Sequence, residues 1–464
     1  MPKPIPNRFF WTWDHSTNWC LHAYGAQNSG VANVYAKAPE MFEADYKRLV
    51  DFCAEHKFNA VGIVGMLRDK HGGVESARRL CDYANNKGVK IYMIAGLYAY
   101  GGIYYEGNHK YSLNRFFGEH PECIGKRIDG TPLIVQFKGK HGYNAEPQGC
   151  ASDERLHEYI LESLDWLFRD IPELGGIQME SGDSGVCQCE RCRARRGEEK
   201  SHISVADMAG IYPEAADVIY SRNPDALVIC ETYHHFTDEA CRYFETEIPD
   251  ENLRKLFAMP EKVFWQWKCD AMLRDNTWSE DDRMLPSMRK FNHVMRAHSG
   301  TQWWGGRAVM EIDKLRRQCR LSHTSGINGV SMFGECASFH TGSEFNYLAL
   351  EYFSDDPYAS NEDYIADVMA PRLGGKAIAE EYFEYAQYTN TPEKIPQASK
   401  RIAKITASIE NYDHLRRWQY LASFLNGYYW EHSQQNPEIT KTKDSDRIGD
   451  NNQTITESKK AKQQ

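Results

Sequence analysis

Strand-like and helix-like segments alternate along most of this chain, and that alternation limits the fold more than any other feature. Short apolar runs of strand length are followed by longer segments with apolar residues at three- and four-residue spacing, such as Met41 to Lys57. Chains with this pattern form a parallel sheet whose crossover connections are helices. About eight strands can be assigned: Phe9–Trp13, Ala60–Val64, Lys90–Leu97, Ile177–Met179, Leu227–Glu231, Val263–Trp267, Gly300–Trp304 and Gly329–Phe333.

Eight such strand–helix units predict an α/β fold of the closed (β/α)8 type, the TIM barrel. After Phe339 the alternation ends and amphipathic helical segments follow one another. We therefore expect a barrel over residues 1–340 and a helical C-terminal segment over residues 341–433. Residues 434–464 are rich in Lys, Asp, Asn, Gln and Thr and poor in large apolar side chains. Such a segment cannot offset its ordering entropy by burial, so a disordered tail is predicted there.

Charge and composition exclude several classes of partner. The net charge is −10 and no stripe of Lys and Arg interleaves with aromatic residues, so we expect no nucleic-acid partner. No apolar run approaches the roughly 18 residues that span a bilayer, and the N-terminus has no signal pattern, so no membrane partner is expected. The 13 cysteines, several inside apolar segments, indicate thiols in a reducing compartment. A cytoplasmic location is predicted for the chain as given, and a secreted or periplasmic one if a signal peptide has been removed; a homo-oligomer remains open.

Side chains at the carboxyl ends of barrel strands converge on one mouth, where such folds carry their chemistry. The chain holds 11 Trp and 27 Tyr, and sugar rings stack on aromatic faces while their hydroxyls form hydrogen bonds. A carbohydrate substrate is therefore predicted. Arg68 is a candidate clamp for a carboxylate or sulfate, although a structural salt bridge explains it equally well. The predicted substrate-binding residues are Asp14, His15, Arg68, His71, Tyr100, Glu231, His234, Trp267 and Trp304.

Two glutamates follow strands on opposite walls of the predicted barrel. Glycoside cleavage needs one protonated carboxyl group that assists the leaving oxygen and one ionised carboxylate that attacks or activates water. Glu180 is predicted as the general acid/base and Glu335 as the nucleophile or general base. Asp183 is the rival catalytic candidate to Glu180, and Glu231 is the rival to Glu335. The sequence does not set the carboxyl separation, so retention and inversion both stay open.

Three cysteines lie within six positions directly after Glu180. Cys187, Cys189 and Cys192 could surround one tetrahedral zinc ion if a fourth thiolate arrives from elsewhere, and Cys150 in the preceding loop is the candidate. Four thiolates leave no open position for a substrate, so this zinc would be structural. The alternative is a loop of thiols without a metal.

These motifs carry a family resemblance. A strand-four glutamate followed by CxCxxC, with HPEC, DGTP and a further cysteine upstream, resembles the barrel of the family 42 β-galactosidases. That resemblance implies a zinc site of Cys150, Cys187, Cys189 and Cys192. The passage NYLALEYFSDDP…APRLGG also resembles uncharacterised and hexosaminidase-like bacterial glycoside hydrolases. Together the resemblances cover about residues 110–200 and 325–375.

One position departs from the β-galactosidase pattern. Met179 stands where that family has an asparagine, so the resemblance does not imply its usual hydrogen bond to the 2-hydroxyl of the sugar. In the hexosaminidase-like relatives an acid carboxylate works beside a neighbour that orients the acetamido group of the substrate. The Glu180 and Asp183 pair is similar to that arrangement.

Two further function classes fit the same residues. A metal-dependent sugar isomerase or epimerase would bind a divalent ion through Glu180, Asp183, Glu231, His234 and His235, and a chelator would abolish its activity. A non-catalytic sugar-binding barrel would keep its affinity after Glu180→Gln and show no turnover. The favoured interpretation is a glycoside hydrolase.

Overall fold

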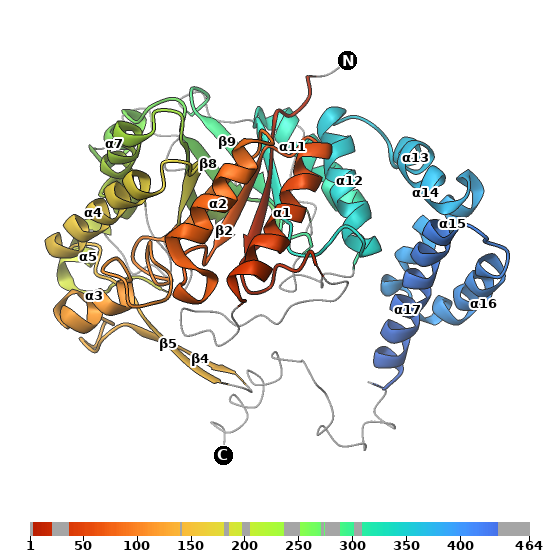
Figure 1. Cartoon of the computed structure of the whole chain (residues 1–464), viewed down its shortest axis with the longest axis horizontal. Coiled ribbons are helices and arrows are strands. Elements are labelled where there is room, and N and C mark those ends of the chain that lie inside the picture. The colour runs from red at the N-terminus through yellow and green to blue at the C-terminus, as the bar shows by residue number, and fades with distance from the viewer. Residues whose placement is uncertain are drawn as a thin grey trace. The chain divides into compact units, whose positions relative to one another are not determined.

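A computed structural model describes residues 3–20, 37–139, 142–180, 185–196, 205–235, 251–270, 273, 288–300 and 309–434 (Figure 1). For residues 135–139, 142–145, 205, 233–235, 253 and 432–434 it describes the backbone alone.

The strands of the first part of the chain close into a parallel barrel, which confirms the predicted fold class. The barrel order is β1-β10-β9-β8-β7-β6-β3-β2, so neighbours in sequence are neighbours in space. Seven predicted strands coincide with barrel strands. The barrel strands are β1 (Asn7–Trp13), β2 (Ala60–Val64), β3 (Lys90–Gly96), β6 (Gly176–Glu180), β7 (Leu227–His235), β8 (Phe264–Lys268), β9 (Asn292–Arg296) and β10 (Gly329–Phe333).

The seventh predicted strand, Gly300–Trp304, is wrong. Strand β9, at Asn292–Arg296, fills that place and pairs in parallel with both β8 and β10. Its sequence, NHVMR, carries a polar residue on each face, His293 outward and Arg296 inward, so the usual apolar alternation is missing. Trp304 and its neighbours from residue 301 on lie outside the described residues.

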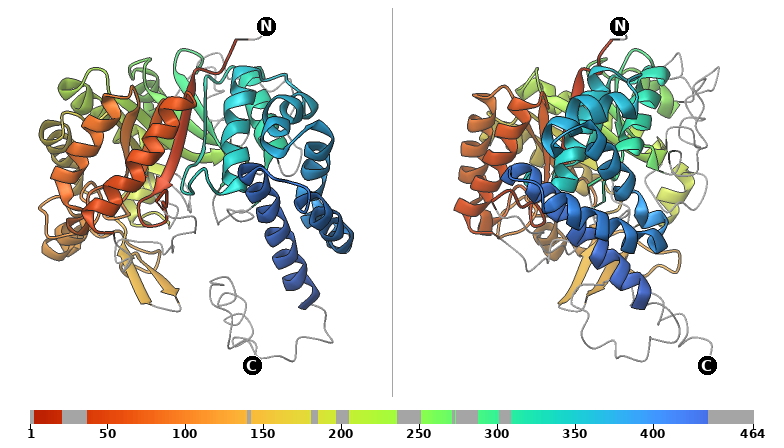
Figure 2. Two further views of the ribbon diagram at one scale, coloured as in Figure 1. Left: turned by 45° about the vertical axis from the view of Figure 1, so that its right-hand side comes forward. Right: turned by 90° about the vertical axis from the view of Figure 1, so that its right-hand side faces the viewer.

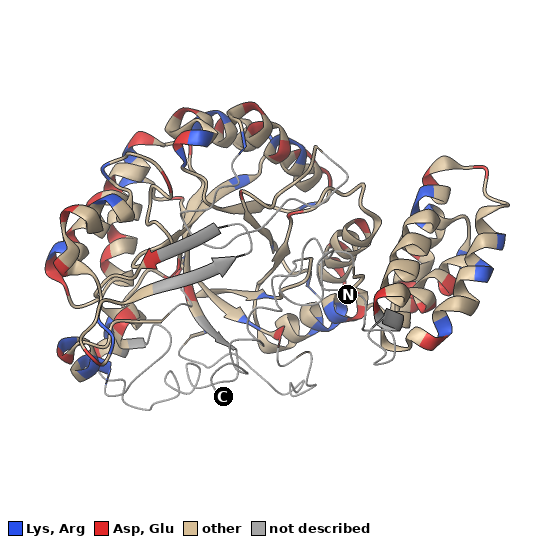
Figure 3. Cartoon of the chain, turned by 90° about the horizontal axis from the view of Figure 1, so that it is seen from below, with Lys and Arg blue, Asp and Glu red and all other residues tan. Residues whose placement is uncertain are grey.

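Helices cover the outside of the barrel, and Lys, Arg, Asp and Glu residues are spread along them (Figure 3). Each helix buries one apolar stripe: α4, for example, buries Leu156, Ile160 and Leu164. The Asp153 side chain caps α4 by accepting the backbone N–H of Leu156 at 3.1 Å. The helices are α1 (Pro39–Glu55), α2 (Gly73–Asn85), α3 (Leu113–Glu119), α4 (Glu154–Asp170), α5 (Glu190–Arg196), α6 (Val205–Ala209), α7 (Tyr212–Arg222), α9 (Glu251–Phe257), α11 (Ile312–Ser325) and α12 (Thr341–Asp355).

Apolar and aromatic side chains fill the barrel on the side where its strands begin. Phe9 packs edge-on against Phe264 and Tyr92, with ring centroids 5.7 Å and 6.1 Å away. Gly62 on β2 leaves room for the Tyr92 ring, because a Cβ atom there would lie 2.3 Å from the ring carbons. At the carboxyl ends of β6, β7, β8 and β9 the inward positions become polar, where they hold Glu180, Glu231, Lys268 and Arg296.

The contacts divide the chain into two compact units, one of residues 1–136 and 144–361 and one of residues 137–143 and 362–464. Helix α12 belongs to the first unit, although the change of sequence pattern at Phe339 predicts a boundary there. In the second unit, the indole N–H of Trp418 donates to the Leu373 carbonyl at 3.2 Å, and the Trp418 ring packs against Tyr382. This unit contains α14 (Ala370–Leu373), α15 (Lys376–Ala386), α16 (Ile395–Thr406) and α17 (Tyr412–Gln434), with α16 and α17 side by side (Figure 2).

The predicted tail falls almost wholly outside the described residues. Among the described helices, none combines the length and the apolar character needed to cross a membrane.

Candidate active site

A buried ion pair joins the carboxyl ends of β1 and β2. Asp14 directly follows β1, and Arg68 follows β2 by four residues. The Arg68 Nε donates to Asp14 Oδ2 at 2.5 Å, and neither side chain is exposed. Burial would raise the pKa of Asp14, but the Arg68 charge and the two nearby histidines outweigh it and hold that pKa well below its usual range. Gly65 makes this approach possible, because a Cβ atom there would lie 2.5 Å from Asp14 Oδ1.

Two histidines flank the Asp14 carboxylate. His15 Nδ1 lies 3.2 Å from Asp14 Oδ1, and His71 Nδ1 lies 3.4 Å from Oδ2. The backbone N–H of Lys37 donates to His71 Nε2 at 3.3 Å, so the ring proton of a neutral His71 sits on Nδ1, facing Asp14. Burial lowers the pKa of His71 to about 4, so this imidazole is neutral near pH 7.

The Arg68 guanidinium is also bound on its other side. It donates to the Glu106 carboxylate and lies over the Tyr105 ring, 4.3 Å from its centroid. Two carboxylates and a ring therefore surround Arg68, which matches the structural salt bridge rather than a clamp for a sugar carboxylate. Asp14, His15, Arg68 and His71 are thus brought together at the mouth as one network. Glu106 was not predicted, because nothing in its local sequence marks it as a partner of a residue 38 positions earlier.

The side chains of Glu180 and Glu231 lie on the adjacent strands β6 and β7 and share one donor. The amide nitrogen of Gln178 donates to Glu180 Oε1 at 3.1 Å and to Glu231 Oε2 at 3.3 Å. Gln266 on β8 donates to the same Glu231 oxygen, and Arg296 on β9 lies 3.6 Å from the other one. All of these side chains are buried.

This arrangement indicates different roles for the two carboxyl groups. Glu231 accepts hydrogen bonds from the amides of Gln178 and Gln266 and lies beside the buried Arg296 cation, and Glu180 accepts a hydrogen bond from the Gln178 amide. The sequence did not predict a role for Gln178, Gln266 or Arg296. Their positions, alternating with apolar residues in strands, were the available signal.

Glu335 lies beyond the end of β10, on the wall opposite β6. Its Oε1 accepts a hydrogen bond from the Ser16 hydroxyl at 2.5 Å and one from the Trp13 backbone N–H at 3.3 Å. The side chain is fully buried. Both donors come from the end of β1, so the loop after β1 fixes the orientation of the Glu335 carboxylate.

One predicted aromatic residue faces the mouth and one does not. Tyr100 packs edge-on against Trp13, with ring centroids 6.2 Å apart, and has a φ of 50° that is uncommon for a residue with a side chain. Trp267 is a correction: Gln266 and Lys268 point into the barrel, so Trp267 points outward, where its indole N–H donates to His293 Nδ1 at 3.1 Å. Asp183 and Trp304 lie outside the described residues, as does the side chain of His234.

A second cluster of charged residues surrounds the ends of β8 and β9. Asp270 Oδ1 accepts the backbone N–H of His298 at 2.8 Å, and Oδ2 lies 2.5 Å from His298 Nδ1. Lys314 of α11 lies 3.2 Å from Asp270 and 3.1 Å from Glu311. His298 was not predicted, because the strand before it was misplaced.

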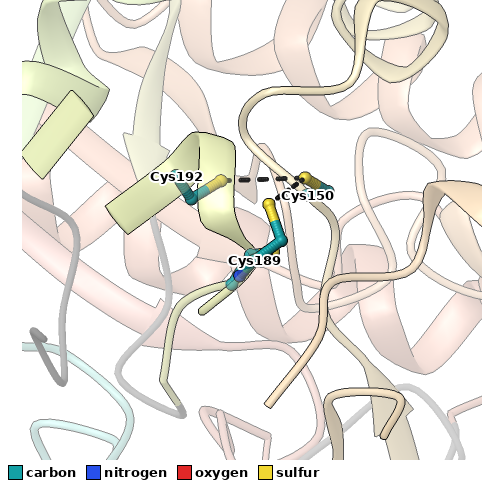
Figure 4. Close-up of side chains that lie close together, drawn as sticks. Cys150, Cys189 and Cys192 are labelled. Carbon is teal, nitrogen blue, oxygen red and sulfur yellow. Dashed lines mark hydrogen bonds between the residues drawn. The ribbon is translucent and has the colours of Figure 1, made fainter. Parts of the chain in front are cut away.

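Four cysteine sulfurs form a compact group: Cys150 follows β5 (Gly142–Pro147), Cys187 and Cys189 lie between β6 and α5, and Cys192 lies on α5. Cys150 Sγ lies 3.8 Å from Cys189 Sγ and 3.7 Å from Cys192 Sγ (Figure 4), and these three with Cys187 fall within 4.8 Å of one another. Four sulfurs at about 2.3 Å from a central zinc ion would be separated by about 3.8 Å, the edge of that tetrahedron. The predicted four residues are thus brought together at distances that fit a tetrahedral metal ion.

Hydrogen-bond donors lie beside two of these sulfurs. Backbone N–H groups of Lys126 and Cys189 point at Cys187 Sγ, at 3.3 Å and 3.4 Å, and the Ser152 hydroxyl lies 3.1 Å from Cys192 Sγ. Hydrogen bonds from Cys150 and Cys187 hold the pKa of Cys192 well below its usual range, while the contacts with Cys187 and Cys192 raise the pKa of Cys150. Four thiolates at these distances repel one another, and a bound cation would balance their charge.

Comparison with known proteins gives fold similarity alone. No family model and no curated sequence matches the chain, so the resemblance to family 42 β-galactosidases stays a prediction. A GH138 enzyme targeting pectin rhamnogalacturonan II matches at 11% identity and a TM-score of 0.52, over 92% of this chain and 57% of that one. An O-GlcNAc hydrolase mutant from Thermobaculum terrenum matches at 11% identity and a TM-score of 0.48, over 84% of this chain and 78% of that one. The chain spans little more than half the length of the first protein, and it is similar to that protein in its barrel fold.

Proposed function

We propose that the protein is a glycoside hydrolase that cleaves an O-glycosidic bond with two carboxyl groups at the barrel mouth. One observation carries this proposal: Glu180 ends β6 and Glu335 follows β10, and three strands separate β6 from β10 on either side of the closed barrel. Two buried carboxyl groups on opposite walls can approach a bond held between them from both sides. The first fold neighbour targets a pectin polysaccharide, which supports a carbohydrate substrate.

The hydrogen bonds favour distinct roles for the pair. The Ser16 hydroxyl and the Trp13 N–H both donate to Glu335, and these two donors orient the carboxyl group that would act as nucleophile or general base. Glu180 accepts a hydrogen bond from the Gln178 amide, which orients its carboxyl group for the role of general acid. Asp183 remains the rival candidate for that role.

The cysteine cluster is proposed to hold a structural zinc ion. Cys150, Cys187, Cys189 and Cys192 would supply four thiolate ligands, and a fully ligated zinc has no position for a substrate. Because Cys187 follows the end of β6 by seven residues, the cluster would stiffen the connection that begins at Glu180.

The test is release of p-nitrophenol from a panel of α- and β-glycosides, including uronides and acetamido sugars. Wild type is compared with Glu180→Gln and Glu335→Gln, and with Glu173→Gln as a matched control. Glu173 pairs with Arg78 on the surface and precedes β6, at the far end of that strand from Glu180. The expected result is turnover by wild type and the control, reduced turnover by Glu180→Gln and no turnover by Glu335→Gln.

Other outcomes would point to the alternative classes. Sugar isomerisation that a chelator abolishes would replace this proposal with a metal-dependent isomerase. Glycan binding by wild type and by Glu180→Gln, without turnover by either, would replace it with a binding barrel.

A further inference from the structure

His298 and Asp270 form a pair that the proposed chemistry does not use. Both hydrogen-bonding atoms of the Asp270 carboxylate face His298: Oδ1 accepts its backbone N–H at 2.8 Å and Oδ2 lies 2.5 Å from its ring Nδ1. Two contacts from one carboxylate fix both the backbone and the ring of His298. The side chains are nearly buried, with exposed fractions of 5% for Asp270 and 15% for His298.

The charges around the pair determine which ring nitrogen carries the proton. Burial would raise the pKa of Asp270, but His298 and Lys314 hold it well below its usual range, so this group is a carboxylate that only accepts hydrogen bonds. His298 Nδ1 must therefore carry a proton. Burial lowers the pKa of His298 in spite of Asp270, which favours the neutral ring with an unprotonated Nε2.

The packing places the His298 ring at the mouth of the barrel. Asp270 lies on the helix side of the mouth, since it contacts Lys314 of α11, and Nε2 is on the edge of the ring remote from the atom that faces Asp270. The His298 ring stacks on Phe333, with centroids 5.4 Å apart and planes 29° apart. Phe333 belongs to the aromatic cluster inside the barrel and precedes Glu335 by two residues. The ring thus lies over the barrel interior, beside the strand that leads to Glu335.

We propose that His298, oriented by Asp270, binds the substrate by accepting a hydrogen bond from a sugar hydroxyl at Nε2. This inference rests on the proposed glycoside hydrolase function and adds a specificity residue to it. A neutral acceptor selects a donor, so His298 favours a hydroxyl and disfavours a sugar carboxylate at this position. Asp270 is a positioning residue, because it acts through His298.

Two substitutions of His298 distinguish a role in substrate binding from a purely structural role. His298→Asn keeps a donor near the position of Nδ1 for Asp270 and places nothing at the position of Nε2, whereas His298→Gln reaches that position with an amide oxygen. On the p-nitrophenyl glycoside that wild type hydrolyses fastest, we expect His298→Asn to raise KM roughly threefold to tenfold with kcat little changed. His298→Gln should recover most of the affinity. His323→Gln on α11 is the control and should match wild type.

The kinetic outcomes decide the inference separately from the function. An unchanged KM in His298→Asn would overturn the role of His298 while leaving the hydrolase in place. An equal rise of KM in His298→Asn and His298→Gln would also overturn it. If His298 were purely structural, an acceptor at the Nε2 position would restore no affinity.

A wild-type protein without turnover would overturn the proposed function instead, and NMR of 15N-histidine-labelled protein would then decide the inference. We expect the Nδ1–H form of His298 at pH 7 and a shift of its Nε2 resonance on titration with the same glycosides. The Nε2–H form, or an Nε2 resonance that no glycoside moves, would overturn the inference.

Discussion

Asp14 and Arg68 form a 2.5 Å ion pair between the ends of β1 and β2, with both side chains fully buried. Neither side chain is exposed to bulk solvent, so the Asp14 charge depends on Arg68, and the Arg68 charge depends on Asp14 and Glu106. The pair also fixes the end of β1, from which Trp13 and Ser16 reach Glu335. A buried charge network thus positions one of the two proposed catalytic carboxyl groups.

Replacing Asp14 should therefore destabilise the protein strongly. Asp14→Asn leaves the buried Arg68 with Glu106 alone, and breaking one side of a buried pair costs about 3 to 5 kcal/mol. Urea unfolding should show this loss as a lower midpoint. Glu173→Gln, which breaks a surface pair with Arg78, should change the midpoint far less. Equal midpoints for the two variants would contradict the buried network.

Acid should destabilise the protein before its carboxylates titrate. Burial lowers the pKa of His71 and of His293 to about 4, below the ordinary 6.5. The unfolded chain therefore binds protons between pH 6.5 and 4 that the folded chain does not, and the free energy of unfolding falls as the pH falls. Each histidine contributes about 3 kcal/mol to this fall. Urea midpoints at pH 7, 5.5 and 4.5 measure it, His71→Asn should flatten the slope, and a constant midpoint would contradict both shifts.

Loss of one cysteine of the cluster should release the metal. Wild type purified with zinc is expected to carry one ion per chain by elemental analysis, and Cys150→Ser should carry much less and melt at a lower temperature, since structural zinc contributes folding energy. Cys123→Ser is the matched control, because Cys123 is buried in the same region and its carbonyl accepts the Cys150 N–H at 3.0 Å. Metal-free wild type, or equal metal in both variants, would contradict the zinc proposal.

Replacing Gln178 should lower kcat more than replacing Gln266. Both amides donate to Glu231, but Gln178 also donates to Glu180. Gln178→Leu should lower kcat about tenfold or more, because a poorly oriented acid loses its alignment with the leaving oxygen. Gln266→Leu removes a donor from Glu231 and leaves the Glu180 contact, so its kcat should fall less. Equal losses of kcat would show that Gln178 does not orient Glu180.

Much of the barrel follows from its sequence, because period-two apolar runs and amphipathic helices are signals of backbone geometry. Strand β9 was not predicted, because it carries polar side chains on both faces. His293 faces outward to Trp267, and Arg296 faces inward to Glu231. The strand was assigned instead to the segment that contains the apolar pair Trp303 and Trp304.

The same alternation explains the error at Trp267. Aromatic residues were expected at the mouth, but at the carboxyl end of β8 the inward positions hold Gln266 and Lys268, and the indole packs outside. A shift of one residue changes the face of a strand, and composition cannot decide it. Cys150 was easier to predict, since a tetrahedral zinc site with three closely spaced thiolates would need a fourth ligand. Glu106 and His298 depend on contacts between distant segments that local patterns do not carry.

The most direct test of the account measures kcat/KM of wild type, Glu180→Gln and Glu335→Gln on a poor leaving group and a good one, the methyl and 2,4-dinitrophenyl glycosides of the same sugar. If Glu180 is the general acid, its loss should cost about 10²-fold to 10⁴-fold on the methyl glycoside and much less on the dinitrophenyl glycoside, which departs without a proton. Glu335→Gln should abolish hydrolysis of both. Wild-type rates in Glu180→Gln on the methyl glycoside would contradict the central claim.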